Sequence, residues 1–553
     1  MEDQPAKLSG NIVDVVKGRI FPGVLELSDG RIHRIQQTDQ PFDHYLLPGF
    51  VDAHIHIESS LLTPAEFARL AVGHGTIACV SDPHEIANVL GVEGVHYMLE
   101  EAQLTPLKIM FGAPSCVPAT SFETAGARLD AAAVEALLAD PRIGYLSEVM
   151  NVPAVLAGEA EMMRKLAAAG ALGKPLDGHA PGLRGKALAG YRAAGITTDH
   201  ESVSLEEAAE KLALGMKVMI REGSAARNFD RLAPLLAGHA DDLFFCSDDK
   251  HPDELLAGHV DALVRRGLKS GVDLMTLLRV ASLNPIRHYG LPVGLLQPGD
   301  PADLIVVEDL QELTVKETII DGVRVFADGR ARLPAGSRRA PNRFEAAPLT
   351  TAELATEGRG RRVRVIEVQD GQLVTTAATE ILQKGEPEPE RDLLKLAVVN
   401  RYAPARPALA FVRGFGLQRG AIASSVAHDS HNLIAVGASD EELCRALNLV
   451  VAHQGGLSWV DGGQDDILPL PVAGLMSYEN GFEVAERYSE LSRHARVLGC
   501  GLRSPYMTLS FLALLVIPEL KLSDKGLFDG RTFELVDLYV PSGTAARPSG
   551  LLS

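Results

Sequence analysis

The chain has 553 residues, well beyond the roughly 250–300 at which a single hydrophobic core stops growing, so we expect two or more folding units. Hydrophobic residues make up 46% of the chain and charged residues 23%, a balance that excludes disordered, collagenous and disulfide-stapled proteins. The formal net charge is −19 and no block of Lys or Arg occurs, so we expect neither nucleic acid nor an anionic membrane as a partner.

The expected location is the cytoplasm. The first ten residues, MEDQPAKLSG, lack the basic and then apolar pattern of a signal peptide. The longest apolar run, residues 511–518, is shorter than the roughly 18 residues that a spanning helix needs. The five cysteines, which show no CxxC spacing and indicate reduced thiols, are Cys79, Cys116, Cys246, Cys444 and Cys500.

Short β-prone segments occur on both sides of the central region. NIVDVVKGRI and GVLELSDGRIHRIQQ precede it, and ADLIVVEDL and VKETIIDGVRVFADG follow it. We expect residues 1–47 and 291–345 to form one small β-sandwich domain. The DGR turns at residues 29–31 and 328–330 need no functional explanation.

Residues 48–290 alternate between short β-prone runs and helical stretches rich in Ala and Leu. Four helices are expected in PAEFARLAVGHG, EAEMMRKLAAAG, GKALAGYRAAG and LEEAAEKLALG, each ending at a glycine that can adopt the left-handed cap conformation. Eight strands are expected, in LLPGFVDAHIHI, TIACVSDPHE, LKIMFGAPS, IGYLSEVMN, PLDGHAPG, ITTDHES, MKVMIREGS and LFFCSDDKHP. This number predicts an α/β fold with a (β/α)8 TIM-like barrel, and a doubly wound open sheet is the alternative.

A change in composition marks the end of this first part. Residues 335–362 are rich in Arg, Pro, Ala and Glu, as is typical of a crossing between domains. Alternating stretches such as RVRVIEV and ALAFVRGFG follow, together with apolar runs at residues 468–476 and 509–518. We therefore expect residues 346–553 to form a C-terminal α+β domain.

Metal-binding residue types stand at the predicted carboxyl ends of the strands, where barrel enzymes build their active sites. His54 and His56 lie two apart on one strand, so both imidazoles face the barrel interior and can chelate one cation. Any one such residue is more often a hydrogen-bonded core histidine or a capping carboxylate. Six of them converging from five strands would concentrate uncompensated charge unless cations bind there. The predicted metal ligands are His54, His56, Glu148, His179, His200 and Asp248.

Several motifs resemble those of the adenine deaminases in the amidohydrolase superfamily, and the resemblance covers nearly the whole chain. In the barrel these are VDAHIHIESS, VSDPHEIANVLG, SEVMNVP, DGHAPG, DHES and CSDD. Past the barrel, HDSHNLIAVG, LPLPVAGLMS and LSFLALLVIPELKLSDKGL resemble the extra C-terminal domain of that family, which most amidohydrolases lack. Many binuclear members have a carboxylated lysine on the fourth strand, whereas this chain offers Glu148, as adenine deaminases do.

The resemblance implies a reaction and a cofactor. Adenine and water would give hypoxanthine and ammonia in purine salvage, with a hydroxide activated at a binuclear centre attacking C6. Two divalent ions per chain are implied, Mn²⁺ or Fe²⁺, with Zn²⁺ as an alternative. One ion would be held by His54, His56, Glu148 and Asp248, and the other by Glu148, His179 and His200. Asp248 would accept the proton of the water and pass it to the leaving nitrogen.

Further candidates are proposed from position alone. Asp82 is a catalytic candidate for proton shuttling; with His84 and Glu85 it can instead contact the purine or simply cap a helix. Glu201, Glu222 and Ser224 are expected to read the edge of the base, and Glu58 has a similar status. His428, Asp429 and His431 allow either an additional metal site or a loop that covers the barrel mouth and orders substrate, and we favour the loop.

Two other classes of function were weighed against deamination of adenine. One is another amidohydrolase activity, either deamination of an N6-substituted adenine or hydrolysis of a cyclic amide. The other is a catalytically inactive scaffold, which is disfavoured because all six candidate ligands are present. The HxE and PCxxC signature of the zinc nucleobase deaminases is absent from the sequence. We expect a small purine as substrate and a homo-oligomer, a dimer or larger.

Overall fold

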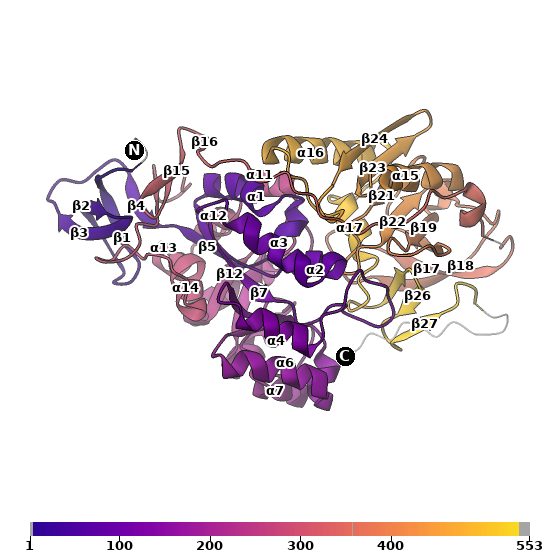
Figure 1. The fold of residues 1–553 in the computed structure, drawn as a ribbon, viewed down its shortest axis with the longest axis horizontal. Helices are drawn as coiled ribbons and strands as arrows, with labels where there is room; N and C mark the ends of the chain where they lie inside the picture. The colour runs from indigo at the N-terminus through magenta and orange to yellow at the C-terminus, as the bar shows by residue number, and fades with distance from the viewer. Residues whose placement is uncertain (1–3, 357, 541–553) are drawn as a thin grey trace. The chain divides into compact units, whose positions relative to one another are not determined.

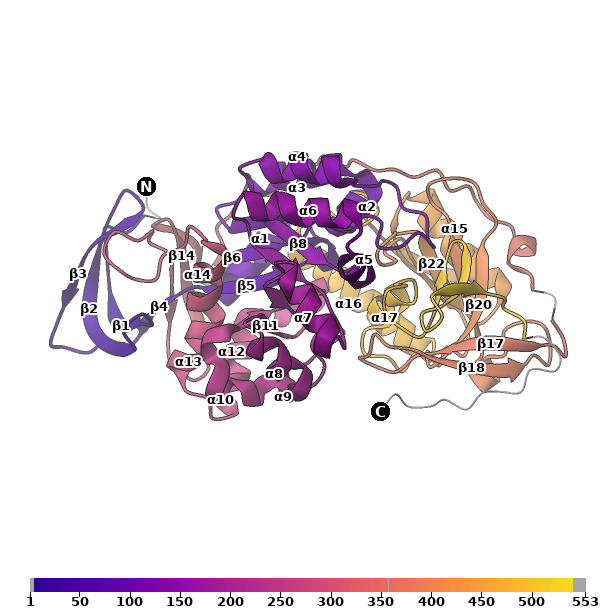
Figure 2. The same ribbon diagram turned by 90° about the horizontal axis from the view of Figure 1, so that it is seen from below.

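The computed structural model describes residues 4–356 and 358–540, and it divides into two compact units (Figures 1 and 2). The first unit comprises the chain up to Ala119, then Gly126–Asn342 and Leu470–Ser489. The second comprises Thr120–Ala125, Arg343–Pro469 and the chain from Glu490 onward. Among the residues described, no helix combines the length and the apolar character that crossing a bilayer requires.

The first unit is built around eight parallel strands, and all eight match predicted ones. Five form one ladder, β5 (Phe50–Ile55), β6 (Thr76–Ser81), β7 (Lys108–Ala113), β8 (Ile143–Val149) and β9 (Leu176–Gly178), and three form another, β10 (Thr198–Asp199), β11 (Lys217–Arg221) and β12 (Leu243–Cys246). Strand β9 lies beside β10 and β12 beside β5, which closes the barrel. Where β12 meets β5, the Asp248 amide donates a hydrogen bond to the His54 carbonyl at 2.9 Å, and the His56 amide donates one to the Asp248 carbonyl at 3.3 Å.

Helices surround these strands (Figures 1 and 2). Every residue of β5 and β6 is buried, as expected for parallel strands covered on both faces. The helices of this unit are α1 (Pro64–Ala71), α2 (His84–Leu90), α3 (Val92–Ala102), α4 (Ala131–Ala139), α5 (Val152–Ala157), α6 (Ala160–Ala171), α7 (Gly185–Ala193), α8 (Leu205–Ala213), α9 (Phe229–Leu232), α10 (Leu236–His239), α11 (Pro252–Ala257), α12 (Val260–Lys269), α13 (Leu274–Leu278) and α14 (Asn284–Tyr289).

The four predicted helices are confirmed, with one error at a helix end. Gly75, Gly195 and Gly215 have positive φ angles of 76°, 102° and 75° just past their helical stretches, as predicted. Gly170 lies inside α6 instead of ending it, and the left-handed residue is Gly173 with a φ of 66°. Either glycine can adopt this conformation, so the local sequence does not select between them.

Strands from both sides of the barrel join in one eight-stranded sheet. Its order is β16 (Arg330–Ala331), β15 (Val323–Ala327), β14 (Val315–Ile320), β13 (Leu304–Val307), β4 (Tyr45–Pro48), β1 (Lys7–Asp14), β2 (Arg19–Ser28) and β3 (Arg31–Gln37). Strand β4 pairs with β1 in parallel and with β13 antiparallel, so it joins the two flanks. Buried apolar residues from both flanks, including Ile12, Leu46 and Leu304, form a shared core.

The second unit contains another eight-stranded sheet, a three-stranded sheet and helices. The larger sheet has the order β18 (Thr376–Ile381), β17 (Arg362–Glu367), β20 (Ala408–Arg413), β19 (Leu394–Val399), β22 (Leu433–Gly437), β21 (Ala421–Ser424), β23 (Gly456–Asp461) and β24 (Gln464–Pro469). The smaller consists of β25 (Leu520–Ser523), β26 (Gly526–Asp529) and β27 (Glu534–Val536). Helix α15 (Asp440–Ala452) packs on the larger sheet, α17 (Pro505–Phe511) lies beside β21, and α16 (Gly481–Val497) begins in the first unit and ends in the second.

Two segments belong to a different unit from the one that their place in the sequence predicts. The segment Leu470–Ser489 packs in the first unit, where the Ser477 amide donates to the Leu61 carbonyl at 2.7 Å and the Gly481 amide donates to Glu66 at 3.0 Å. The segment Thr120–Ala125 packs in the second, where the Thr124 amide donates to Asp524 at 2.8 Å. These long-range hydrogen bonds have no local sequence signal.

Candidate metal centre

Two histidines and an aspartate converge where β5 and β12 meet. The Nε2 atoms of His54 and His56 are 3.2 Å apart. Oδ1 of Asp248 lies 3.6 Å from the first of these atoms and 3.1 Å from the second. All three side chains are buried. The strand alternation that placed both imidazoles inside the barrel is therefore confirmed, and Asp248 completes a three-residue group.

Glu148, at the end of β8, lies between this group and two further histidines. One carboxylate oxygen, Oε1, is 3.4 Å from His56 Nε2. The other, Oε2, is 2.8 Å from His179 Nδ1 and 3.2 Å from His200 Nε2. The rings of His54 and His200 are stacked with their centroids 4.0 Å apart, so the two histidine groups are in direct contact.

These six residues fit divalent cations. An ion bound at about 2.0–2.2 Å holds neighbouring ligand atoms roughly 3.0–3.5 Å apart, close to the 2.8–3.6 Å found here. Several subsets of the six have ligand atoms that all lie within 4.8 Å of one another. Within the described part of the chain, the buried atoms His54 Nδ1, His179 Nε2 and His200 Nδ1 have no hydrogen-bond partner. Burying imidazoles and carboxylates this closely is favourable when a cation binds between them.

The charges of the site suit exchange of protons for cations. Burial raises the pKa of Glu148, but His179 and His200 outweigh it and hold this pKa well below the ordinary value. Burial lowers the pKa of His179, yet the carboxylates of Glu201 and Glu148 raise it to about 9. These shifts favour the anionic form of Glu148 and the protonated form of His179. A divalent cation, if bound here, would take the place of such a proton as the positive partner of the carboxylates.

Arg221, the last residue of β11, is a member of the site that the sequence analysis missed. Its Nη1 donates to both Glu201 Oε1 and Asp248 Oδ2, and its Nη2 donates to Glu201 Oε2 at 2.9 Å. Burial raises the pKa of Asp248, whereas Arg221 and the hydrogen bonds from His54 and His56 hold it well below the ordinary value. An inward-facing arginine at the carboxyl end of a barrel strand was the available signal.

The structure brings Asp82 and His84 to the cluster. Asp82 Oδ2 is 3.0 Å from His84 Nδ1, which is itself 3.2 Å from Glu148 Oε1. Glu85 Oε1 is 3.4 Å from His84 Nε2. Asp82 Oδ1 also accepts hydrogen bonds from the His84 amide at 3.1 Å and from the hydroxyl of Ser147 at 2.7 Å. Asp82 therefore has a structural contact at the start of α2 as well as a place beside Glu148.

Glu58 lies on the same side of the site as these residues. Its Oε1 accepts a hydrogen bond from the Ile86 amide at 3.2 Å, and its side chain is buried. Burial raises the pKa of Glu58 to about 7, and Glu85 raises it as well while His56 opposes them. The hydroxyl of the neighbouring Ser59 donates a hydrogen bond to Asp249 at 2.5 Å.

Glu222 does not join Glu201 near the histidines. Glu201 Oε1 is 3.7 Å from both His179 Nδ1 and His200 Nε2. Glu222 instead pairs with Arg266 at 2.9 Å, because successive strand residues face opposite sides and Arg221 takes the inward one. Ser224 donates to Glu254 at 3.3 Å. The outward position of Glu222 does not favour its predicted role at the edge of the base, and the roles of Glu201 and Ser224 stay predictions.

The loop between β21 and β22 carries His428, Asp429 and His431 in the second unit. The His428 ring stacks on Phe511 with centroids 4.7 Å apart, and it lies 5.7 Å from the His431 ring. The carboxyl group of Asp429, together with burial, raises the pKa of Glu123 in the same unit to about 8, burial being the larger cause. These contacts order the loop within its own unit.

Comparison with known proteins covers both halves of the chain. The family model described as the amidohydrolase family matches residues 45–325, and that described as the adenine deaminase C-terminal domain matches residues 371–534. Adenine deaminases of Sulfurovum sp. (strain NBC37-1) and Salinibacter ruber are each 53% identical, covering 96% of this chain and 99% of the relative. The adenine deaminase of Methanosarcina barkeri is 50% identical, with 96% and 98% covered.

Solved structures of more distant proteins are also similar to this chain. A β-aspartyl dipeptidase of Fervidobacterium islandicum AW-1 has a TM-score of 0.46 and 15% identity, covering 59% of this chain and 97% of that one. A D-hydantoinase of a Thermus species has a TM-score of 0.45 and 15% identity, covering 60% and 97%.

Replacing Glu148 by Gln is expected to reduce bound metal and activity together while the fold survives, because a neutral amide is a poor ligand for two cations. Elemental analysis of purified protein gives the metal content, and circular dichroism checks the fold. Glu222→Gln is the matched control and should keep the metal content of the wild type. Two metals per chain retained in Glu148→Gln would refute the shared-ligand role.

Proposed function

The chain belongs to the adenine deaminase family, within the amidohydrolase fold, and we infer that it converts adenine and water to hypoxanthine and ammonia. The observation that carries this inference is identity of about 50% to adenine deaminases over 96% of the chain. The match also covers the C-terminal domain, at residues 371–534, so the similarity is not limited to the barrel.

We propose that the site holds two divalent ions with Glu148 as the shared ligand. His54, His56 and Asp248 would complete one set, and His179 and His200 the other, as their 2.8–3.6 Å spacing allows. Nitrogen and carboxylate ligands suit Mn²⁺ or Fe²⁺, with Zn²⁺ as the alternative. Divalent cations, when bound, make water acidic enough to act as a nucleophile at neutral pH.

Asp248 is the proposed general acid and base. It would accept a proton from the water that attacks C6 and return a proton to the exocyclic nitrogen, which leaves as ammonia. Arg221 donates to Oδ2 of this carboxylate, so it fixes the orientation of Asp248 and favours its anionic form. The proposed role of Arg221 is therefore to position the catalytic carboxylate.

Asp82, His84 and Glu85 form the proposed second proton path or purine contact. The 3.0 Å separation of Asp82 and His84 is that of a hydrogen bond, and the 3.4 Å separation of His84 and Glu85 is an ion-pair contact. All three are buried, so a proton that reaches them is sheltered from exchange with bulk water. A path of this kind would serve the ring nitrogen of the purine as C6 becomes tetrahedral.

The substrate is tested directly by incubating metal-loaded protein with adenine, N6-methyladenine and dihydroorotate. Ammonia, methylamine and ring opening are measured respectively, together with the elemental composition of the protein. We expect ammonia from adenine at the highest kcat/KM. Faster release of methylamine or faster ring opening would assign the chain to another activity of the same fold.

Asp248→Asn is expected to lower kcat by at least about 10²-fold, because an amide can neither accept nor return the proton. Metal content must be measured on the same preparation, since Asp248 is also a proposed ligand. A variant that keeps its metals and has near wild-type kcat would show that the general acid and base is another group.

Arg221→Met is expected to lower kcat by about 10²-fold, since loss of a positioning contact misaligns the reacting groups. Arg221→Lys should recover part of kcat, because the ammonium can still donate to Asp248 but cannot also hold Glu201 with a planar fork. Thermal unfolding separates this effect from loss of stability. Equal kcat values for wild type, Arg221→Met and Arg221→Lys would contradict the positioning role.

A further inference from the structure

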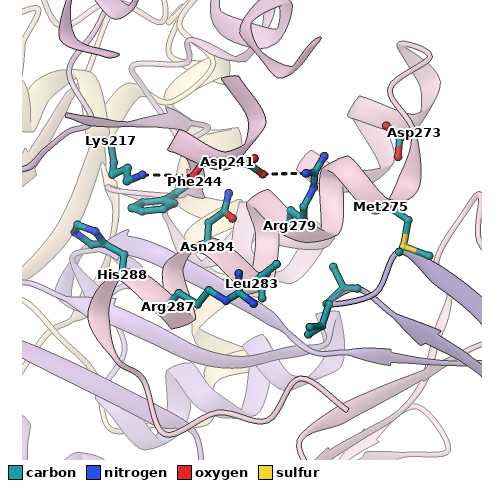
Figure 3. A pocket seen from close by; sticks show the side chains of 13 residues that line it. Lys217, Asp241, Phe244, Asp273, Met275, Arg279, Leu283, Asn284, Arg287 and His288 are labelled. Carbon is teal, nitrogen blue, oxygen red and sulfur yellow. Dashed lines mark hydrogen bonds and ion pairs between the residues drawn. The ribbon is translucent and has the colours of Figure 1, made fainter. Parts of the chain in front are cut away.

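A cavity of about 910 Å³ lies at the opposite end of the barrel from the metal centre (Figure 3). Lys217 is the first residue of β11 and Phe244 the second of β12, whereas Arg221 and Asp248 lie at or beyond the other ends of these strands. Figure 3 places Lys217, Phe244 and His288 on one side, Arg279 and Met275 on the other, and Asn284 and Arg287 between them. The cavity is therefore separate from the catalytic site.

The two acidic side chains that line the cavity already have partners. Asp241 pairs with Arg279 at 2.9 Å. Asp273 caps α13, accepting hydrogen bonds from the amide of Thr276 at 3.0 Å and from its hydroxyl at 2.5 Å. Neither carboxylate is left to neutralise the remaining basic groups of the cavity.

Three basic groups remain. Lys217 pairs with Asp242 but has further donor capacity, because an ammonium offers three hydrogens. Within the described residues, the exposed Arg287 makes no hydrogen bond or ion pair, so all five of its donors can reach a ligand. In the same part of the chain, the buried Nε2 atom of His288 has no hydrogen-bond partner.

Lys217 and His288 oppose each other electrostatically. Burial, and to a smaller extent the charge of Lys217, lower the pKa of His288 to about 4. An anion between these two groups would remove their repulsion and favour the protonated imidazole. The planar fork of Arg287, which lines the same cavity, is suited to bind two anionic oxygens at once.

We propose that this cavity binds a phosphate monoester through Lys217, Arg287 and His288. A phosphate monoester carries close to two negative charges at neutral pH, so it attracts the charge of Arg287 and the remaining donors of Lys217 more strongly than a singly charged carboxylate does. The volume lies in the range of about 300–1,000 Å³ typical of small-molecule sites and exceeds what a phosphate alone would fill. Val15, Val16 and Met275 provide an apolar wall for the organic part of the ester.

Calorimetric titration of the full chain with phenyl phosphate tests the site, with inorganic phosphate as the second probe and ionic strength held constant. We expect one phenyl phosphate per chain, bound at least tenfold more tightly than inorganic phosphate. Arg287→Gln and His288→Asn should each weaken binding at least tenfold. Arg34→Gln is the control: it removes an equal charge from an exposed arginine on β3 and should leave the affinity for phenyl phosphate unchanged.

Nuclear magnetic resonance of ¹³C-labelled histidine gives a readout independent of activity, with the His288 signal assigned by its loss in His288→Asn. Saturating phenyl phosphate should raise the pKa of His288 from about 4 by more than one unit. The proposal is overturned if this pKa does not move, or if Arg34→Gln weakens binding as much as Arg287→Gln. Equal affinity for the two probes would overturn the assignment to a monoester.

Discussion

The interaction on which the site depends is the buried carboxylate of Glu148, which four histidines approach within 3.4 Å. One oxygen faces His56 and His84, and the other faces His179 and His200. A buried carboxylate is stable only when its charge is compensated. The strand ends that carry these histidines must therefore meet at one point, and closure of the barrel brings them there. The same geometry supports the proposal that Glu148 is the ligand shared by two cations.

The surrounding structure holds the ligands through paired buried charges. Asp52, two residues before His54, accepts hydrogen bonds from the Ser247 amide at 3.0 Å and from His259 Nε2 at 2.8 Å, which ties β5 to the residue before Asp248. Asp199, the neighbour of His200, pairs with the buried Lys211 at 2.7 Å. Such supporting contacts fix ligand orientation and are commonly as important as the ligands themselves. They also keep each neighbouring charge neutralised before any cation binds.

The sequence was sufficient for the strands and for the convergence of the candidate metal ligands, because both depend on local pattern. Alternation placed His54 and His56 on one side, and the strand–helix repeat placed Glu148 and Asp248 at strand ends. It was insufficient for Glu222, since the inward position at the end of β11 belongs to its neighbour Arg221. It was also insufficient for Leu470–Ser489, whose place depends on hydrogen bonds to residues about 400 positions away, such as that of Gly481 to Glu66. Contacts between distant segments leave no periodic signal for a single sequence to reveal.

The most direct test of the account is anomalous X-ray scattering from crystals of the metal-loaded protein, recorded at the absorption edges of manganese, iron and zinc. The account predicts two peaks at the barrel mouth, one near His54, His56 and Asp248 and the other near His179 and His200, with an oxygen of Glu148 within bonding distance of each. It would be contradicted by the absence of peaks there in an active preparation, or by two ions of which neither is bound to Glu148.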